Sequence, residues 1–323
     1  MITRRSILQG AAVGGVAALI GGETIAFARA SQPSTPVNFQ VPAGACDCHT
    51  HIFGDPARFP FAAVRAYTPE SASIEEQRAL HRALHIERTV IVTPSVYGTD
   101  NSCTLDAMKH LGPISRGVAV IGEKTPDSDL DSMARAGIRG IRINMETAGQ
   151  TDPALGRRRF QQAVARIHGR NWHIQIYTRL SVIEAIKDQV AAAPMPVVFD
   201  HFGGAQAALG TGQPGFATLV DLVRTGKAYV KISAPYRAST MPPDYPDVAP
   251  LAKELIAANP QRILWGSDWP HPAKPVPGRK FTEITPLWKI DDGRILNLLP
   301  EWAPDAALRK TILVENPARL YGF

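Results

Sequence analysis

The chain has 323 residues and a formal net charge of +6. This length is enough for one large α/β domain or two small ones. The sequence has no run of lysine and arginine of the kind that tracks nucleic acid or anionic lipid, which argues against either as a partner. The three cysteines are an odd number, which argues against a framework of disulfides.

The first 30 residues have the pattern of an export signal. A basic start with Arg4 and Arg5 is followed by a Gly/Ala-rich apolar run over residues 7–20 and then by the small residues of AFARA. The run is too short and too rich in glycine for a spanning helix, and the paired arginines resemble the twin-arginine signal of bacteria. We expect the export machinery to carry the chain to the periplasm, with a retained anchor as the alternative.

Residues 31–44 form a polar lead-in, and residues 45–323 are predicted to form one domain in which short β-rich runs alternate with amphipathic helical segments. Eight strands that alternate with helices predict a parallel sheet, and at this length a closed (β/α)₈ barrel. An open doubly wound sheet is the alternative, but no glycine-rich phosphate motif follows the first strand. The expected strands are 45–51, 88–94, 116–122, 139–144, 172–177, 195–200, 228–233 and 262–268.

The first strand contains the motif CDCHTHIFG at residues 46–54. Because side chains alternate between the two faces of a strand, Asp47, His49 and His51 are predicted to share one face. Cys46 and Cys48 are then expected on the other face, packed against the helices. This separation argues against a metal cluster of cysteine and histidine.

Two further polar residues stand at strand ends, His201 after the sixth strand and Asp268 after the eighth. Active sites of (β/α)₈ barrels lie at the C-terminal ends of the strands, so these residues and the two histidines of strand one are expected to converge. Taken singly, His201 can be a packed core residue and Asp268 a helix N-cap. The long loops 52–72 and 270–300 are expected to wall the site.

Six segments together resemble the amidohydrolase superfamily, and within it the branch of 2-pyrone-4,6-dicarboxylate and 4-sulfomuconolactone hydrolases. These segments are DCHTHIFG, GTDN, RGIRIN, VVFDHFGG, ILWGSDWPHP and LVENPARLYGF. The resemblance implies a distorted (β/α)₈ barrel that hydrolyses a C–O or C–N acyl bond. It also implies that His49, His51, His201 and Asp268 belong to the active site.

One departure from the superfamily concerns the metal. Binuclear members carry a lysine at the end of strand four and a histidine at the end of strand five, where this chain has Asn144 and Tyr177. His173 lies near the start of its strand and is expected in the core or at the bottom of the barrel. The alternatives are no metal, or a single Zn²⁺ held by His49, His51, Asp268 and His201, since three or four N/O ligands suffice for zinc.

The chemistry of these residues suggests roles for them. Asp268 is the only acid among the four, so we assign it as the general base that activates water. The three histidines, protonated or holding zinc, stabilise the oxyanion that develops on a lactone carbonyl. Guanidinium forks match carboxylate or sulfonate oxygens. The predicted substrate-binding residues are Arg142, Tyr177, Tyr97, Arg237 and Arg65.

The sequence therefore predicts a hydrolase that opens a small anionic lactone, such as a pyrone dicarboxylate or 4-sulfomuconolactone, in the breakdown of aromatic compounds. A lactone isomerase or a zinc-dependent decarboxylase on the same barrel is the enzymatic alternative. A periplasmic binding protein is a third, although such proteins usually have two open-sheet domains. Nothing in the sequence indicates an oligomeric state.

Overall fold

The computed structural model describes residues 30–273, 275 and 278–323. The predicted signal segment lies almost wholly outside the described residues. Within them, no helix is long and apolar enough to cross a membrane. All three cysteines, at positions 46, 48 and 103, are buried and free, in agreement with the expected lack of a disulfide framework.

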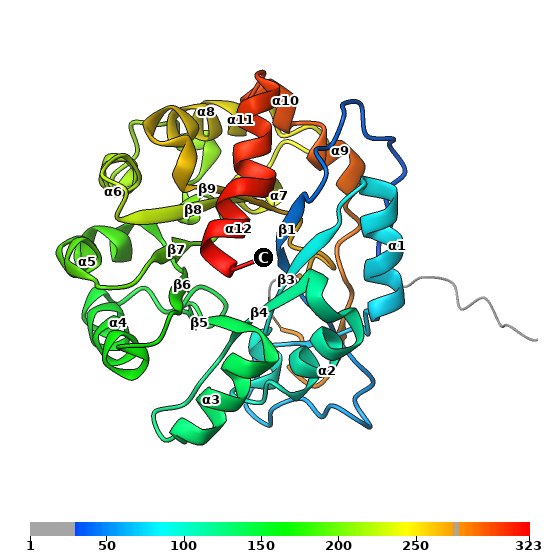
Figure 1. Cartoon of the computed structure of the whole chain (residues 1–323), viewed down its shortest axis with the longest axis vertical. Coiled ribbons are helices and arrows are strands. Elements are labelled where there is room, and N and C mark those ends of the chain that lie inside the picture. The colour runs from blue at the N-terminus through cyan, green and yellow to red at the C-terminus, as the bar shows by residue number, and fades with distance from the viewer. Residues whose placement is uncertain (1–29, 274, 276–277) are drawn as a thin grey trace, which may run out of the picture.

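Eight parallel strands form the central sheet, in the order β1-β3-β4-β5-β6-β7-β8-β9 (Figure 1). The first and last strands meet, because the Asp268 amide donates to the His49 carbonyl oxygen at 2.8 Å and the His51 amide to that of Trp269 at 2.8 Å. The sheet is therefore a closed barrel, which excludes the open doubly wound alternative. The strands are Cys46–Thr50, Arg88–Val92, Ser115–Ala119, Ile138–Asn144, His173–Tyr177, Val197–Phe199, Ala228–Ser233 and Ile263–Gly266.

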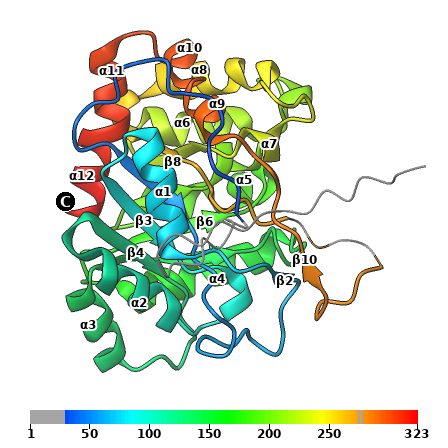
Figure 2. The same ribbon diagram turned by 90° about the vertical axis from the view of Figure 1, so that its right-hand side faces the viewer.

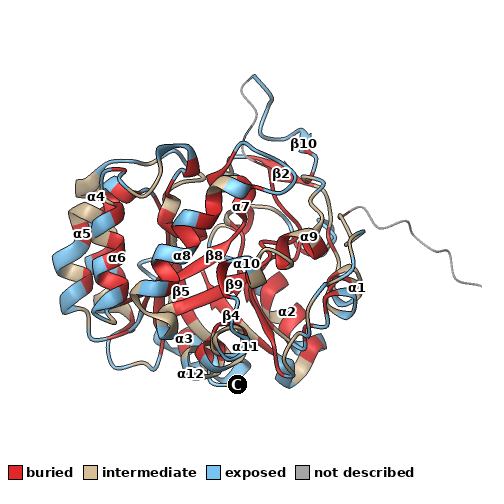
Figure 3. Ribbon diagram, turned by 90° about the horizontal axis from the view of Figure 1, so that it is seen from above, coloured by how far each residue is buried: buried red, intermediate tan, exposed pale blue. Residues whose placement is uncertain are grey.

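The helices form a ring outside the barrel (Figure 1), and they are buried on the side that faces it and exposed on the outer side (Figure 3). The first begins at a capping box, in which Ser73 accepts from the Glu76 amide and the Glu76 side chain accepts from the Ser73 amide. Such a cap stabilises a helix by about 1 kcal/mol. The main helices are α1 Ile74–Leu84, α2 Ser102–Leu111, α3 Asp127–Ala136, α4 Pro153–Ile167, α5 Leu180–Ala192, α6 Phe216–Arg224 and α8 Ala249–Ala258.

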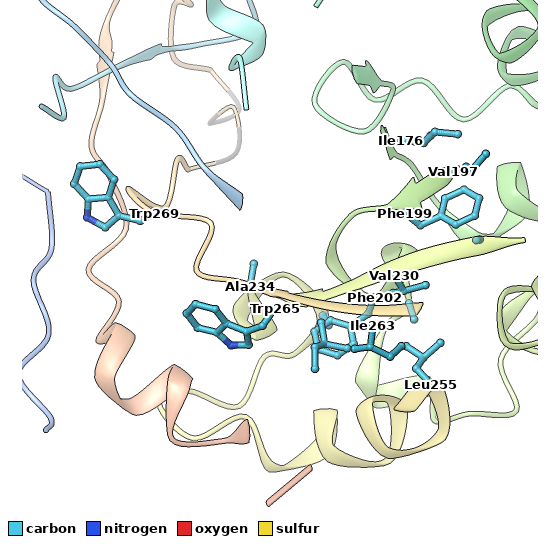
Figure 4. Close-up of a cluster of buried hydrophobic side chains, with 14 of the residues drawn as sticks. Ile176, Val197, Phe199, Phe202, Val230, Ala234, Leu255, Ile263, Trp265 and Trp269 are labelled. Carbon is cyan, nitrogen blue, oxygen red and sulfur yellow. The ribbon is translucent and has the colours of Figure 1, made fainter. Parts of the chain in front are cut away.

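The largest apolar cluster lies between the strands and the helices. Figure 4 shows the part of it beside β7, β8 and β9, with Phe202, Val230 and Ile263 grouped together and Phe199 and Trp265 on either side of them. Trp265 and both phenylalanines are fully buried. Burial of one such side chain contributes about 1.5–3 kcal/mol or more, so this layer fixes the barrel wall that carries the polar strand ends.

The C-terminal helix α12, Asn316–Tyr321, covers the end of the barrel where the strands begin (Figure 1). The ring of Tyr321 packs edge-on against that of His173, with centroids 5.2 Å apart. His173 therefore lies at the bottom of the barrel, as the sequence predicts, and not at the mouth. The other end of the barrel is left for the active site.

The long loops after β1 and β9 meet at this other end. Short strands β2, Thr68–Pro69, and β10, Ile284–Thr285, pair in parallel, and Thr68 Oγ1 donates to the carbonyl oxygen of Phe281 at 2.6 Å. Figure 2 shows β2 and β10 on the side of the molecule opposite α12. The two loops thus form a wall at the mouth, as the sequence predicts.

Candidate active site

A cavity of about 310 Å³ lies at the C-terminal ends of the strands. It contains most of the residues that the sequence assigns to catalysis and substrate binding, and side chains from the two long loops. The predicted residues that line it are His51, His201, Asp268, Arg142, Tyr177 and Arg237, joined by Tyr67, Ser95, Asn144, Glu146 and Arg179.

Three imidazoles converge on one carboxylate oxygen at the floor of this cavity. Oδ1 of Asp268 lies 3.5 Å from Nε2 of His49, 3.4 Å from Nε2 of His51 and 3.7 Å from Nε2 of His201. All four side chains are buried. His201 and Asp268 also have positive φ angles of 50° and 63°, a conformation that costs roughly 1 kcal/mol or more for residues other than glycine and clusters at functional sites.

The side chains of the first strand do not alternate strictly between its two faces, as the sequence predicts they would. The register with β3 shifts between Asp47 and Thr50, which marks a β-bulge. Asp47 consequently points outward, where it accepts from the Ser267 hydroxyl and lies 3.3 Å from His81 of α1. Cys48 points inward together with the histidine that follows it, and packs in an interior cluster that contains Val90 and Leu264.

The predicted faces of the first strand are therefore wrong for Asp47 and the two cysteines, and right for the histidine pair. The physical reason is the extra residue of the bulge, which places two consecutive side chains on one face. His49 and His51 still share the interior because Thr50, between them, points out to Gln77 of α1.

Burial controls the protonation of the three imidazoles. It lowers the pKa of His49 well below its usual range, lowers that of His51, and lowers that of His201 to about 4. The rings are therefore neutral near pH 7. Nδ1 of His51 lies 2.7 Å from the carbonyl oxygen of Val92, which can only accept, so Nδ1 carries the proton. Nε2 of His51 then presents a lone pair toward Asp268.

This donor set fits one metal ion. Facing lone pairs on Nε2 of His51 and Oδ1 of Asp268 repel each other unless a cation lies between them. Nε2 of His49 and Oδ1 of Asp268 are buried and have no hydrogen-bond partner among the described residues. Ligand atoms of His49, His201 and Asp268 lie within 4.8 Å of one another. Neutral imidazoles and a carboxylate are ligands that Zn²⁺ prefers.

The second oxygen of Asp268 is held by two donors. Nε of Arg237 lies 2.6 Å from Oδ2, and the hydroxyl of Tyr236 donates to the same oxygen at 2.8 Å. Burial alone would raise the pKa of Asp268, but the charge of Arg237 holds it well below its usual range. Asp268 is thus ionised, with one oxygen fixed and the other directed into the site. Tyr236 is a site residue that sequence reasoning missed.

Arg142 and Tyr177 lie together on one wall of the cavity. Arg142 is 8% exposed, and its guanidinium lies 5.7 Å from the centre of the Tyr177 ring. Arg142 and Arg237 both line the cavity, and Arg237 is the one that contacts the Asp268 carboxylate. Arg179 lies farther out, where it pairs with Glu146 at 2.7 Å. The arrangement favours a substrate that carries at least one anionic group near its reacting carbonyl.

Arg65 and Tyr97, predicted to bind substrate, do not line the cavity. Both side chains form hydrogen bonds with residues of the loop that follows the first strand. Arg65 donates to Thr68 Oγ1 at 2.8 Å and to the carbonyl oxygen of Ala62 at 2.8 Å. The Tyr97 hydroxyl accepts from the Gly54 amide at 3.0 Å. Tyr67 from the same loop lines the cavity instead.

A second polar layer lies directly below the histidines. Nζ of Lys231 is 3.1 Å from Nδ1 of His49, 2.7 Å from Oε1 of Gln175 and 3.3 Å from Oδ1 of Asp200. Burial alone would raise the pKa of Asp200, but the charge of Lys231 holds it well below its usual range. The layer orients His49 from behind, and its inward residues alternate with outward apolar ones along β6 and β8.

A closed parallel barrel with histidines and an aspartate at its C-terminal mouth defines a hydrolase-type active site of the kind that activates water. Residues 46–323 match the Amidohydrolase family model (Amidohydro_2), and the chain belongs to this family.

The chain is similar to proteins of named activity. It is 37% identical to a 4-sulfomuconolactone hydrolase of Rhizobium radiobacter, over 90% of this chain and 93% of that protein. It is 34% identical to a 2-pyrone-4,6-dicarboxylate hydrolase of Comamonas testosteroni, over 90% of this chain and 94% of the relative. A crystal structure from Agrobacterium tumefaciens matches with a TM-score of 0.73 and 26% identity, covering 90% of this chain and 98% of that one.

Proposed function

We propose that this protein is a lactone hydrolase that opens the ring of a small anionic lactone of the 4-sulfomuconolactone or pyrone-dicarboxylate type, in the degradation of aromatic compounds. The observation that carries the proposal is the convergence of three neutral imidazoles on one oxygen of Asp268. The guanidinium groups of Arg142 and Arg237 line the same cavity. The relatives named above hydrolyse substrates of this class.

The ionised Asp268 carboxylate accepts the proton of the attacking water through Oδ1. Because Arg237 and Tyr236 hold Oδ2, the carboxylate keeps its orientation while the proton arrives. After attack on the lactone carbonyl, the ring C–O bond breaks and Asp268 returns the proton to the leaving oxygen. The products are a carboxylate and a hydroxyl, or the keto form where that hydroxyl is enolic.

The residues suited to hold a metal are His49, His51, His201 and Asp268. A bound Zn²⁺ supplies a Lewis acid that polarises the carbonyl and lowers the pKa of water. The chain itself keeps the Nε2 lone pair of His51 directed inward through the Val92 carbonyl oxygen, and the Ser233 hydroxyl, 2.8 Å from Nδ1 of His201, holds the ring of His201 in place.

Arg142 and Arg237 bind the anionic groups of the ring in this proposal, and the Tyr177 and Tyr67 rings flank it. A guanidinium that meets a carboxylate or sulfonate forms charge-assisted hydrogen bonds, which are stronger than neutral ones. Both arginines are already in place, so little side-chain ordering is needed on binding.

A panel of lactones, assayed with and without added zinc, tests the proposal by product mass. Hydrolysis adds one water to a carboxylated or sulfonated lactone, isomerisation leaves the mass unchanged, and decarboxylation removes carbon dioxide. Preferential hydrolysis of anionic lactones over neutral ones is the expected result. An isomer or a decarboxylated product would instead establish one of the alternatives, and no turnover on any lactone would refute the proposal.

We also propose that the protein works outside the cytoplasm. The support is the sequence pattern of its first 30 residues, with Arg4 and Arg5 before a short apolar run. Three free cysteines suit a chain that folds before it is exported.

A further inference from the structure

Behind Asp268, on the side away from the cavity, three buried side chains form a line of hydrogen bonds. The Tyr236 hydroxyl, from α7 (Pro235–Ala238), donates to Oδ2 of Asp268 at 2.8 Å. Its oxygen lies 3.1 Å from Nδ1 of His271, and Nε2 of His271 lies 2.9 Å from Oδ2 of Asp292. Tyr236 is 8% exposed, and His271 and Asp292 are not exposed at all.

The ionised Asp268 at one end of this line determines which atom donates in each hydrogen bond. A phenol has one proton, and the ionised Asp268 can only accept, so the Tyr236 proton points toward Asp268. The phenol oxygen must then accept from Nδ1–H of His271. At the other nitrogen, either Nε2–H donates to the Asp292 carboxylate or a protonated Asp292 donates to Nε2. Burial raises the pKa of Asp292, which favours the second form.

In both forms, His271 and Asp292 together hold one proton more than a neutral ring and a carboxylate would. If Nδ1 of His271 lacked its proton, it would attract the phenol proton of Tyr236. The phenol oxygen would then face Oδ2 of Asp268 lone pair to lone pair at 2.8 Å. The proton on Nδ1 therefore decides whether Tyr236 supports Asp268 or opposes it.

We propose that Tyr236, His271 and Asp292 are positioning residues for the reaction, which fix Asp268 with Oδ2 engaged and Oδ1 free to receive the proton of water. The line fixes the carboxylate plane together with Arg237, which binds the same oxygen at 2.6 Å. It also belongs to the turn that presents Asp268, because the His271 amide donates to the Asp268 carbonyl oxygen at 2.8 Å. The inference rests on the proposed lactone hydrolysis for its kinetic consequences only.

The kinetic test compares Tyr236→Phe, His271→Gln and the double variant with the wild type on a lactone that the wild type hydrolyses. Loss of a partner that orients an active-site ligand lowers activity by roughly 10- to 100-fold. We expect each single variant to lose kcat in this range with little change in KM. The double variant should be no worse than Tyr236→Phe, because the line is already broken.

Tyr229→Phe is the matched control. Tyr229 is also a buried tyrosine, but its hydroxyl meets Arg262 at 3.4 Å and it does not line the cavity. It should retain the wild-type kcat. Wild-type kcat in Tyr236→Phe, or losses that multiply in the double variant, would overturn the inference.

A second measurement does not depend on turnover. In metal-free wild-type protein, ¹⁵N NMR of the His271 ring, assigned by its absence in His271→Gln, should show a protonated Nδ1. An unprotonated Nδ1 would overturn the proposed direction of the line even if the lactone assay succeeds. If no lactone is hydrolysed but Nδ1 is protonated, the proposed function fails and the hydrogen-bond line stands.

Discussion

Nδ1 of His51 lies 2.7 Å from the carbonyl oxygen of Val92, and this contact decides which ring nitrogen carries the proton. A carbonyl oxygen only accepts, so the Nε2 lone pair of His51 is directed at Asp268, 3.4 Å away. Nε2 of His51 and Oδ1 of Asp268 are both acceptors, so no hydrogen bond can form between them. The contact prepares His51 as a ligand before any metal arrives, which is the usual effect of a partner behind a metal-binding histidine.

We predict one zinc per chain. The mouth positions of β5 and β6 hold Asn144 and Tyr177, neither of which supplies the lysine or histidine of a second site. Elemental analysis after zinc loading and dialysis should give one equivalent. His51→Asn should bind zinc more weakly, whereas His173→Asn, also buried in the barrel, should not. Two equivalents, with activity that depends on both, would contradict the prediction.

Arg142→Met should weaken binding of an anionic lactone. Loss of one charged hydrogen bond costs about 1.5–3 kcal/mol, which corresponds to an increase of roughly 10- to 150-fold in the dissociation constant. A lactone without an anionic group serves as the control, and its turnover should change much less. Equal losses on both substrates would mean that Arg142 acts through its contact with Asp200, 3.5 Å away, and not on the substrate.

The stability of the metal-free protein should fall as the pH drops from about 6.5. Burial lowers the pKa of His173 to about 3. Between that value and the ordinary histidine pKa the unfolded chain binds the extra proton and the folded chain does not, so acid favours unfolding. One such histidine contributes a slope of about 1.4 kcal/mol per pH unit.

Urea denaturation of the metal-free protein at several pH values between 6 and 4 measures that slope. His173→Gln should lower this slope by about 1.4 kcal/mol per pH unit, the contribution of one proton, because the group that titrates is removed. The same substitution at the exposed His168 is the control for the change of side chain itself. An unchanged slope in His173→Gln would show that His173 does not stay neutral in the fold.

The export proposal predicts that Arg4→Lys with Arg5→Lys strands the precursor in the cytoplasm. The twin-arginine pattern is read by a receptor, so conserving the charge should not rescue transport. Fractionation of cells that produce the wild type and the double variant measures the periplasmic share. Equal periplasmic recovery of the two would speak against this route.

The barrel was predictable because its signals are local and repeated. Each strand such as RTVIV at 88–92 is a short apolar run followed by a helical segment, and that alternation determines the topology. The convergence of His49, His51, His201 and Asp268 then follows from barrel geometry alone. Family resemblance added the type of chemistry to this arrangement.

The features that sequence reasoning missed depend on contacts between distant segments. The bulge near Cys48 has no glycine or proline to mark it, so the sequence alone predicts strict alternation. Tyr236 and Asp292 join the site through hydrogen bonds across 32 and 21 residues of chain, and nothing in their own neighbourhood predicts a polar partner. Arg65 has the charge expected of a substrate-binding residue, but its loop folds so that its Nε and Nη1 groups donate within the loop and the residue does not line the cavity.

The last prediction concerns Asp268, whose replacement by Asn should reduce kcat by about 10²- to 10⁴-fold, the usual worth of a positioned acid–base group. Asn keeps the size and can still accept from Arg237 and Tyr236, but it cannot take the proton of water. Affinity for an anionic lactone should stay similar or rise, because a negative charge beside the substrate is removed. The measurement is kcat and KM with the zinc content determined on the same samples.

Asp305→Asn is the matched control, because Asp305 caps α11 (Ala306–Lys310) by accepting from the Ala307 amide, a role that Asn fills equally well. It should behave as the wild type in both kcat and stability. If Asp268 were also only a backbone-capping residue, Asp268→Asn would behave in the same way. Near-wild-type kcat in a folded Asp268→Asn protein would therefore refute the role of Asp268 as the general base, because an amide cannot accept the proton of water.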